Sequence, residues 1–284
     1  MSSYILKPDP GDPRLTRRVR GVDESGARIE TSVVVERPLT LFLNGQEIVT
    51  MMTIGDHPDC LAVGYLINQN MLQPEDEITG IDHDDDLGVM VVRTARKTDF
   101  ERKLRKKTLT SGCAQGTVFG DMMDGLQSTQ LPDARSARIS QSMLRNILEV
   151  MRQQDSIHRK AGSVHGCALF RGTEKLMFIE DVGRHNAIDT IAGWMWMNHV
   201  QGADKVFYTT GRLTSEMVMK SAQIGVPIIV SRNGVTAMGH EMAKRLGMTL
   251  FGRASNRHFI CYTGFERFDS EPEPQRAPVR VVAG

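Results

Sequence analysis

The fold class is decided by residues 205–230, which read KVFYTTGRLTSEMVMKSAQIGVPIIV. Residues 205–209 form a short apolar run of the kind found in a buried strand. Residues 214–223 have the pattern of a helix, and Gly225 follows as a stop signal. Residues 226–230 are apolar again. A helix that ends at glycine and leads at once into an apolar run is typical of strand–helix units on a sheet, so this stretch predicts an α/β domain.

The same alternation continues on both sides of this stretch. Toward the C-terminus we predict a helix over 236–246, stopped by Gly247, and a strand over 248–251. Toward the N-terminus we predict strands and helices over residues 140–153 (helix), 164–170 (strand), 175–180 (strand) and 185–199 (helix). The last twenty residues are rich in Pro and Glu, which favours a flexible tail over 265–284.

The N-terminal part follows a different pattern. Residues 39–43 and 46–51 are apolar and alternating, and the Asn44-Gly45 pair between them is the dipeptide that best suits a type I′ hairpin turn. A helix is predicted to open near Pro58, where proline is tolerated. We therefore expect a flexible arm over 1–28, a small α+β domain over 29–110, and an α/β domain over 111–264 that begins with the loop of Cys113.

Composition excludes several classes of protein. The chain has 284 residues and a formal net charge of +1, so bulk attraction to nucleic acid or to an anionic membrane is not implied. No apolar run approaches the roughly 18 residues that indicate a membrane span, and the N-terminus lacks the features of a signal peptide. The four cysteines are scattered without a Cys-x-x-Cys pair, which favours a reduced, cytoplasmic protein without disulfides.

Cys113 has the most suggestive surroundings of the four cysteines. Gly112 and Gly116 flank it, so the loop can adopt unusual backbone angles and expose its N–H groups. The basic run over 102–107 could lower the pKa of the thiol and so supply the thiolate, which is the reactive species. A small, unreactive residue in a glycine-rich turn is an equal alternative on local sequence. The other cysteines lie in a predicted helix (Cys60) or in strands (Cys167, Cys261), where free cysteines are usually buried hydrophobes.

The segment over 180–186, Glu-Asp-Val-Gly-Arg-His-Asn, places polar residues where a strand turns into a helix. Helix N-termini bind anions, and Arg184 adds a fork of donors that suits phosphate. His185 could transfer protons near neutral pH. The alternative is a structural turn in which Asp181 caps the helix and forms salt bridges.

Further strand-to-helix turns with polar tips occur over 209–216, which includes Gly211 and Arg212, and over 231–236. Residues 251–258 continue the theme after the last predicted strand. Ligands of open α/β sheets collect at the carboxyl ends of strands, so an arginine in each turn suggests a polyphosphate or nucleotide site. His165-Gly166-Cys167 is similar to a fragment of a deaminase zinc site, but His-x-Glu and Pro-Cys-x-x-Cys are missing. Zinc-dependent deamination is therefore not expected, and we predict no metal site.

Several of these strings together resemble the formate dehydrogenase accessory sulfurtransferase (FdhD) family. The likeness spans residues 29 to about 264 and is carried most clearly by Thr110 to Cys113, Glu180 to Ala187, Gly211 to Met217 and Gly225 to Ile228.

The resemblance implies both a fold and an activity. The fold is a cytidine deaminase-like α/β domain preceded by a small ubiquitin-like roll. The activity is that of a sulfurtransferase, which carries persulfide sulfur from a cysteine desulfurase to the molybdenum bis-guanine-dinucleotide cofactor of formate dehydrogenase. Cys113 matches the sulfur-carrying cysteine. The segment that matches the family's cofactor contact is Phe251, Gly252, Arg253, Ala254, Ser255 and Asn256, to which our own reading of the turns adds Arg184, His185, Gly211 and Arg212. The family also suggests a homodimer.

The chain departs from the family at the second cysteine of the loop, and this limits the chemistry that the resemblance implies. Many members carry Cys-x-x-Cys where this chain has Cys113-Ala114-Gln115-Gly116. Sulfur relay needs one thiolate, so the carrier role survives, whereas a redox mechanism that needs two thiols does not. The main alternative is a chaperone that binds the molybdenum cofactor without covalent sulfur chemistry.

Overall fold

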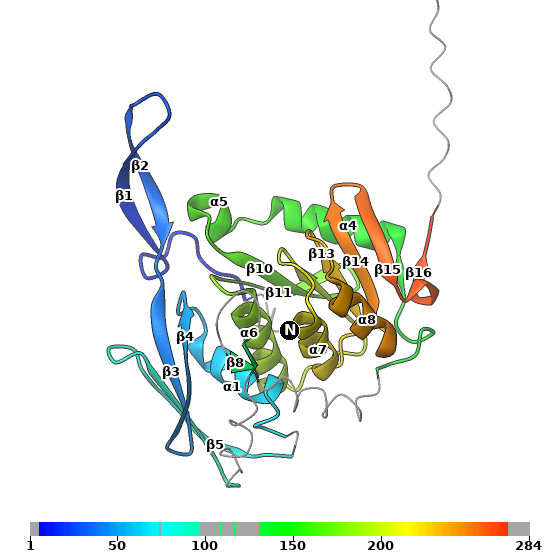
Figure 1. The fold of residues 1–284 in the computed structure, drawn as a ribbon, viewed down its shortest axis with the longest axis horizontal. Coiled ribbons are helices and arrows are strands. Elements are labelled where there is room, and N and C mark those ends of the chain that lie inside the picture. Colours follow the sequence, from blue (N-terminus) through cyan, green and yellow to red (C-terminus); the bar gives the residue numbers. More distant parts are fainter. Residues whose placement is uncertain (1–5, 74, 97–107, 110–115, 118–130, 272–284) are drawn as a thin grey trace, which may run out of the picture.

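The computed structural model describes residues 6–73, 75–96, 108–109, 116–117 and 131–271. It is a mixed α/β structure, as predicted, built on one six-stranded sheet with helices on both faces (Figure 1). The strands lie in the order β11-β10-β12-β13-β14-β15. Their bounds are β10 His165–Arg171, β11 Glu174–Asp181, β12 Lys205–Thr209, β13 Ile228–Ser231, β14 Thr249–Ser255 and β15 His258–Thr263. β12, β13 and β14 are parallel, and the remaining neighbours are antiparallel.

The two faces of this sheet carry different helices because successive side chains of a strand point to opposite sides. Cys167 and Leu169 of β10 belong to the core that packs on α6, α7 and α8. Ala168 and Phe170 belong to the core on the other face, under α4. The helices are α4 Gln141–Gln153, α5 Ile157–Ala161, α6 Arg184–Met197, α7 Ser215–Gln223 and α8 Ala237–Arg245. The helices and strands predicted over 140–251 are therefore confirmed, with ends that differ by a few residues.

A second sheet of four strands packs around one helix in the N-terminal part. Its order is β4-β3-β6-β5, with β3 Arg37–Leu43, β4 Gln46–Thr53, β5 Ile78–Asp84, β6 Val89–Thr94 and helix α1 Pro58–Asn68. Asn44 and Gly45 both have positive φ, at 50° and 85°, as the predicted type I′ turn between β3 and β4 requires. The helix begins at Pro58, as predicted.

The two parts of the molecule meet where α1 crosses α6. A Cβ added to Gly64 of α1 would lie 1.7 Å from the carbonyl oxygen of Asp189, and one added to Gly193 of α6 would lie 1.9 Å from that of Cys60. The two helix backbones therefore touch at a pair of glycines, closer than any side chain would allow. This contact joins the four-stranded sheet to the six-stranded one.

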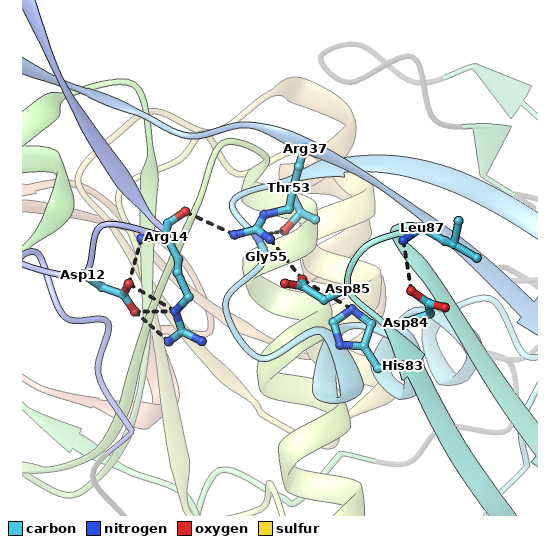
Figure 2. Close-up of polar contacts among 9 residues, drawn as sticks. All are labelled: Asp12, Arg14, Arg37, Thr53, Gly55, His83, Asp84, Asp85 and Leu87. Atoms are coloured by element: carbon cyan, nitrogen blue, oxygen red, sulfur yellow. Dashed lines mark hydrogen bonds and ion pairs between the residues drawn. The ribbon is translucent and has the colours of Figure 1, made fainter.

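Regular structure begins earlier than we predict. Residues expected to form a flexible arm contain β1 Thr16–Val22, which pairs with β2 Arg28–Val34 as an antiparallel ribbon. Arg37 holds the chain just before the ribbon to the four-stranded sheet: it donates to the carbonyl oxygen of Arg14 at 3.1 Å and to Asp85 at 3.0 Å (Figure 2). The position of the domain boundaries stays a prediction.

Several further observations differ from the sequence expectations. β14 extends to Ser255 and pairs with β15. Most of the segment 251–256 therefore belongs to the strand, whereas we predicted a turn after a strand that ends at residue 251. Helix α5 and the strands β5 and β15 were not predicted. The expected flexible tail over 265–284 is wrong in its first residues, because β16 Phe268–Asp269 pairs with β9 Ile139–Ser140. The Cys113 loop and the basic run over 102–107 lie outside the described residues. No helix in the described ranges is long and apolar enough to cross a membrane.

The glycine contact between α1 and α6 can be tested by adding one methyl group. We expect Gly64→Ala or Gly193→Ala to lower the free energy of unfolding by about 3 kcal/mol or more, because the new Cβ would overlap backbone atoms. Gly234→Ala is the matched control, since a Cβ there meets nothing within 4 Å. Urea unfolding followed by circular dichroism measures the difference. Equal midpoints for the three variants would contradict the described packing.

Candidate functional site

The polar ends of the strands meet at one edge of the six-stranded sheet. This edge contains the carboxyl ends of β11, β12, β13 and β14 together with the start of β10, which runs the opposite way to β12. Backbone hydrogen bonds connect the turns here: Thr210 N–H donates to Gly166 O at 2.8 Å, Arg232 N–H to Thr209 O at 3.1 Å, and Arg253 N–H to Asn233 O at 2.9 Å. The predicted convergence of these turns on one sheet edge is therefore observed.

A cavity of about 330 Å³ opens at this edge, between the sheet and the helices α4 and α5. Its floor is apolar and aromatic, and its rim is mostly cationic. The apolar residues are Leu148, Met151, Phe178, Tyr208 and Ala254; the basic ones are Arg152, His158, Arg159 and Arg232; the others are Gln154, Ser156, Gly166, Glu180, Thr210, Ser255 and Asn256. Apolar and aromatic surface beside basic side chains suits a ligand that has a planar ring and an anionic group.

The predicted segment 251–256 contributes half of its residues to the cavity. Ala254, Ser255 and Asn256 line it. Phe251 is buried in the core below, where its ring meets Phe259 and Phe268 edge to face at centroid distances of 5.7 and 5.2 Å. Gly252 and Arg253 lie beside the neighbouring turn, residues 231–236.

Arg253 and Gly252 are held by that neighbouring turn. A Cβ on Gly252 would lie 3.1 Å from Asn233 O, so the glycine permits the two turns to approach closely. Arg253 is exposed and has a left-handed φ of 51°. Its side chain is thus outside the cavity walls but free to reach a group that extends beyond them.

Arg184 and His185 do not line the cavity. They lie in the first turn of α6, with 4% and 3% of their surface exposed. A Cβ on Gly211 would lie 2.9 Å from Cδ of Arg184, so this turn of the β12–α7 connection rests on the arginine side chain. Arg212 is exposed. Burial is the main reason that the pKa of His165 is lowered, and the positive charges of Arg184 and Arg212 lower it further. These residues therefore form a second basic group at the same edge, on the α6 side of the sheet.

His185 is not suited to proton transfer near neutral pH. Burial lowers the pKa of its imidazole well below the usual value, and the charges of Lys220 and Arg184 lower it further. Its Nε2 lies 3.5 Å from Oε2 of Glu216. The lowered pKa and the burial of the imidazole give no support to the expected proton shuttle at this position.

The two neighbouring carboxylates at the end of β11 face opposite sides of the sheet. Asp181 accepts hydrogen bonds from Gly183 N–H at 2.9 Å and from Asn186 Nδ2 at 2.7 Å, so it holds the turn before α6. The helix N-cap itself is Gly183, and Asp181 makes no ion pair with the described residues, so the capping and salt bridges considered from the sequence are not observed. It also accepts from Thr53 Oγ1 and the N–H of Ile54, at 2.5 and 3.2 Å, which connects the β4–α1 turn to α6.

Glu180, in contrast, belongs to the cavity. It is 1% exposed and accepts from the N–H groups of Ile157 and His158, at 2.6 and 3.1 Å, at the start of α5. Burial raises the pKa of its carboxyl group to about 7, against the effect of these two hydrogen bonds. Glu180 thus fixes α5 as a wall of the cavity.

The α4–α5 wall is the part of the site that sequence reasoning missed. Arg152, His158 and Arg159 are about one hundred residues from Ser255 in the chain, and no local motif marks them. The only available signal was the basic end of the predicted helix over 140–153. Arg232 lies in a turn that was named, although the residue itself was not assigned to the site.

The described cysteines are poor candidates for a reactive thiol. Burial raises the pKa of both Cys60 and Cys167 to about 12, and that of Cys261 to about 11. A thiol with such a pKa supplies very little thiolate at neutral pH. Cys113 lies outside the described residues, so its role stays a prediction. Within the described ranges, no three His, Cys, Asp or Glu side chains are placed to hold a metal ion.

The raised pKa of Glu180 has a consequence for stability. A carboxyl group whose pKa is higher in the folded than in the unfolded protein favours folding when protonated. Its contribution is complete below its ordinary pKa of 4.5 and is lost as the pH rises through about 7. Each pKa unit corresponds to about 1.4 kcal/mol, so between pH 4.5 and 8 the wild type should lose roughly 3 kcal/mol more than Glu180→Gln. Glu174 is an exposed carboxylate on the same strand, so Glu174→Gln is the control and should lose as much stability as the wild type. Urea unfolding at several pH values measures the free energy of unfolding of the three proteins. Parallel pH dependences for all three would contradict the raised pKa of Glu180.

Comparison with known proteins agrees with this arrangement. The profile of the FdhD/NarQ family matches residues 34–269. The chain is 32% identical over 243 residues to the sulfur carrier protein FdhD of Bacillus subtilis, covering 85% of this chain and 92% of the relative. It is 30% identical to the sulfur carrier protein FdhD of Wolinella succinogenes, covering 86% and 84%. A crystal structure of a formate dehydrogenase accessory protein from Desulfotalea psychrophila superposes with a TM-score of 0.72 at 25% identity, covering 89% of this chain and 98% of that one. The chain therefore belongs to the FdhD/NarQ family.

Proposed function

We propose that this protein is a sulfur carrier that accepts persulfide sulfur on Cys113 from a cysteine desulfurase. It then transfers this sulfur to the molybdenum bis-guanine-dinucleotide cofactor, for use by formate dehydrogenase. Membership of the FdhD/NarQ family supports a sulfur-transfer role. The observation that carries the cofactor part is the cavity at the sheet edge, where Ala254, Ser255 and Asn256 meet a cationic rim.

The first step of the proposal is thiol exchange at Cys113. Its thiolate attacks the outer sulfur of the donor's persulfide, so a new S–S bond forms on Cys113 and the donor's S–S bond breaks. The inner sulfur, which belongs to the donor's own cysteine, leaves as a thiolate, so charge and atoms balance. The high pKa values of Cys60, Cys167 and Cys261 leave Cys113 as the candidate.

The second step requires the cofactor to be held as a substrate. A volume of about 330 Å³ is at the lower end of the range for ligand pockets, roughly 300–1,000 Å³. It therefore suits one guanine nucleotide end of a larger molecule. Phe178 and Tyr208 offer aromatic surface for the base, and the basic rim offers donors for phosphate oxygens.

We also propose the finer fold assignment. The order β11-β10-β12-β13-β14, with helices on both faces, supports a cytidine deaminase-like domain, and the four-stranded sheet around α1 supports a ubiquitin-like roll. The His-x-Glu and Pro-Cys-x-x-Cys strings of the zinc deaminases are absent from this chain. The carrier role would thus use a related fold without the deaminase chemistry.

The sulfur step predicts one modified residue. We expect incubation with a cysteine desulfurase and L-cysteine to add a single sulfur to the wild type and none to Cys113→Ala, as read by intact mass and peptide mapping. Persulfide on Cys60 or Cys167 would overturn the assignment. If Cys113→Ala still supports formate dehydrogenase maturation in cells, the protein acts as a cofactor chaperone without covalent chemistry.

The cofactor step predicts a role for Arg232, which lines the cavity, and for Arg253, which lies outside its walls beside the neighbouring turn. We expect Arg232→Ala and Arg253→Ala each to weaken binding of guanosine diphosphate about tenfold, because each removes a charge-assisted hydrogen bond to phosphate. Arg257→Ala removes another exposed charge, one that neither lines the cavity nor bonds to the turn at Asn233, and should bind like the wild type. Titration calorimetry measures all three, with thermal unfolding to show that the fold is intact. Unchanged affinity in both variants would remove the cavity as the cofactor site.

A further inference from the structure

Glu180 is the only carboxylate among the described residues that line the sheet-edge cavity. It is 1% exposed, so it lies at the buried end of that cavity. The basic residues of the rim are all exposed: Arg152, His158, Arg159 and Arg232. A ligand whose anionic group meets this rim therefore directs its other end toward Glu180.

The carboxylate of Glu180 can accept further hydrogen bonds. Its Oε2 accepts from Ile157 N–H at 2.6 Å and its Oε1 accepts from His158 N–H at 3.1 Å. Each oxygen of an ionised carboxylate has two lone pairs, so each retains a free one. Glu180 forms no ion pair with any described residue. Because a buried carboxylate without a cation is costly, it gains more from donors on a ligand than an exposed carboxylate would.

An aromatic ring lies beside this carboxylate. Phe178 is two residues before Glu180 on β11, so both side chains point to the same face of the sheet. Gly166 is directly opposite Glu180 on β10, and a Cβ there would lie 2.7 Å from Cε2 of Phe178. The glycine thus permits the Phe178 ring to lie against the backbone next to Glu180. A planar base stacked on this ring has its edge close to the carboxylate.

Other polar side chains of the cavity are already bonded within the protein. Thr210 Oγ1 accepts from Gly166 N–H at 3.0 Å, and Gln154 Oε1 accepts from Lys175 Nζ. Among the described lining residues, Glu180 alone presents two acceptor oxygens side by side. It is therefore the group that can distinguish one base edge from another.

We propose that Glu180 sets the base specificity of this cavity by accepting hydrogen bonds from the ring N–H and the amino group of guanine. This inference rests on the proposed function, which places a guanine nucleotide in the cavity. Guanine presents these two donors next to each other, hypoxanthine presents the ring N–H alone, and adenine presents a ring acceptor beside its amino group. A carboxylate, which only accepts, matches the first, half of the second, and opposes the third.

A series of ligands tests the inference on the unchanged protein. At pH 8 Glu180 is mostly ionised, since its pKa is about 7. We expect guanosine diphosphate to bind about tenfold more tightly than inosine diphosphate and about a hundredfold more tightly than adenosine diphosphate, because each lost hydrogen bond to the carboxylate costs about a factor of ten. Titration calorimetry measures the three Kd values. Equal affinities would overturn the inference and leave the cavity as the cofactor site, whereas no binding of any nucleotide would overturn the cofactor site as well.

Glu180→Gln tests the residue itself. Glutamine keeps one acceptor and replaces the other with a donor, which is the pattern that pairs with adenine. The variant should bind guanosine diphosphate about tenfold more weakly than the wild type and adenosine diphosphate about tenfold more tightly, so that the preference for guanine disappears. Damage to the cavity wall would weaken both ligands and could not strengthen one of them. Glu174→Gln is the control on the same strand and should keep the wild-type preference. A hundredfold preference that survives in Glu180→Gln, or an equal loss of both ligands, would overturn the proposal.

Discussion

The contact between Gly64 and Gly193 is the constraint on which the rest of the structure depends. Because neither residue has a Cβ, helix α1 lies directly on the backbone of α6, and the two sheets are joined through that one crossing. Polar groups around the crossing are buried and paired. Lys220 of α7 contacts Asp189 at 2.7 and 2.9 Å, and Asn68 of α1 donates to the same carboxylate at 2.6 Å. Removing one partner of such a pair would leave a buried charge uncompensated, so the three helices are held in one arrangement.

This arrangement sets the position of the candidate site. Asp181 ends β11, holds the turn before α6 and accepts two hydrogen bonds from the β4–α1 turn of the other sheet. The strand ends are therefore fixed from both parts of the molecule. Although burial raises the pKa of Asp181 to about 6, four donors oppose that effect.

Because successive side chains of β11 point to opposite faces of the sheet, its two neighbouring carboxylates have different roles. Asp181 faces α6 and serves the junction, whereas Glu180 faces α5 and closes the cavity. The same division explains why the basic residues form two groups. One group lies on the α6 side of the sheet and includes Arg184 and His165. The other lines the cavity on the α4–α5 side and includes Arg152, Arg159 and Arg232. An anionic ligand at this edge would meet positive charge from both directions.

Much of the fold could be read from local patterns, because hydrophobic periodicity and turn chemistry act between residues close in the chain. The type I′ turn at Asn44-Gly45, the helix start at Pro58 and the strand–helix order over 205–251 are of this kind. The meeting of the polar strand ends could also be predicted, since parallel strands bring their carboxyl ends to one edge. Cys113 was singled out from sequence and family resemblance, and its place in three dimensions lies outside the described residues.

Burial and distant neighbours were decided only by the tertiary structure. Local sequence could not show that Arg184 and His185 are buried, or that the turn at Gly211 lies on Arg184, because that turn is more than twenty residues away. Nor could it supply the α4–α5 wall, which reaches Ser255 and Asn256 only after the sheet is assembled. The extension of β14 to Ser255 depends on pairing with β15, and the ribbon at 16–34 depends on cross-strand bonds. In each case the surroundings of the residues are set by packing between elements that are distant in the chain. The local sequence pattern carries no information about that packing.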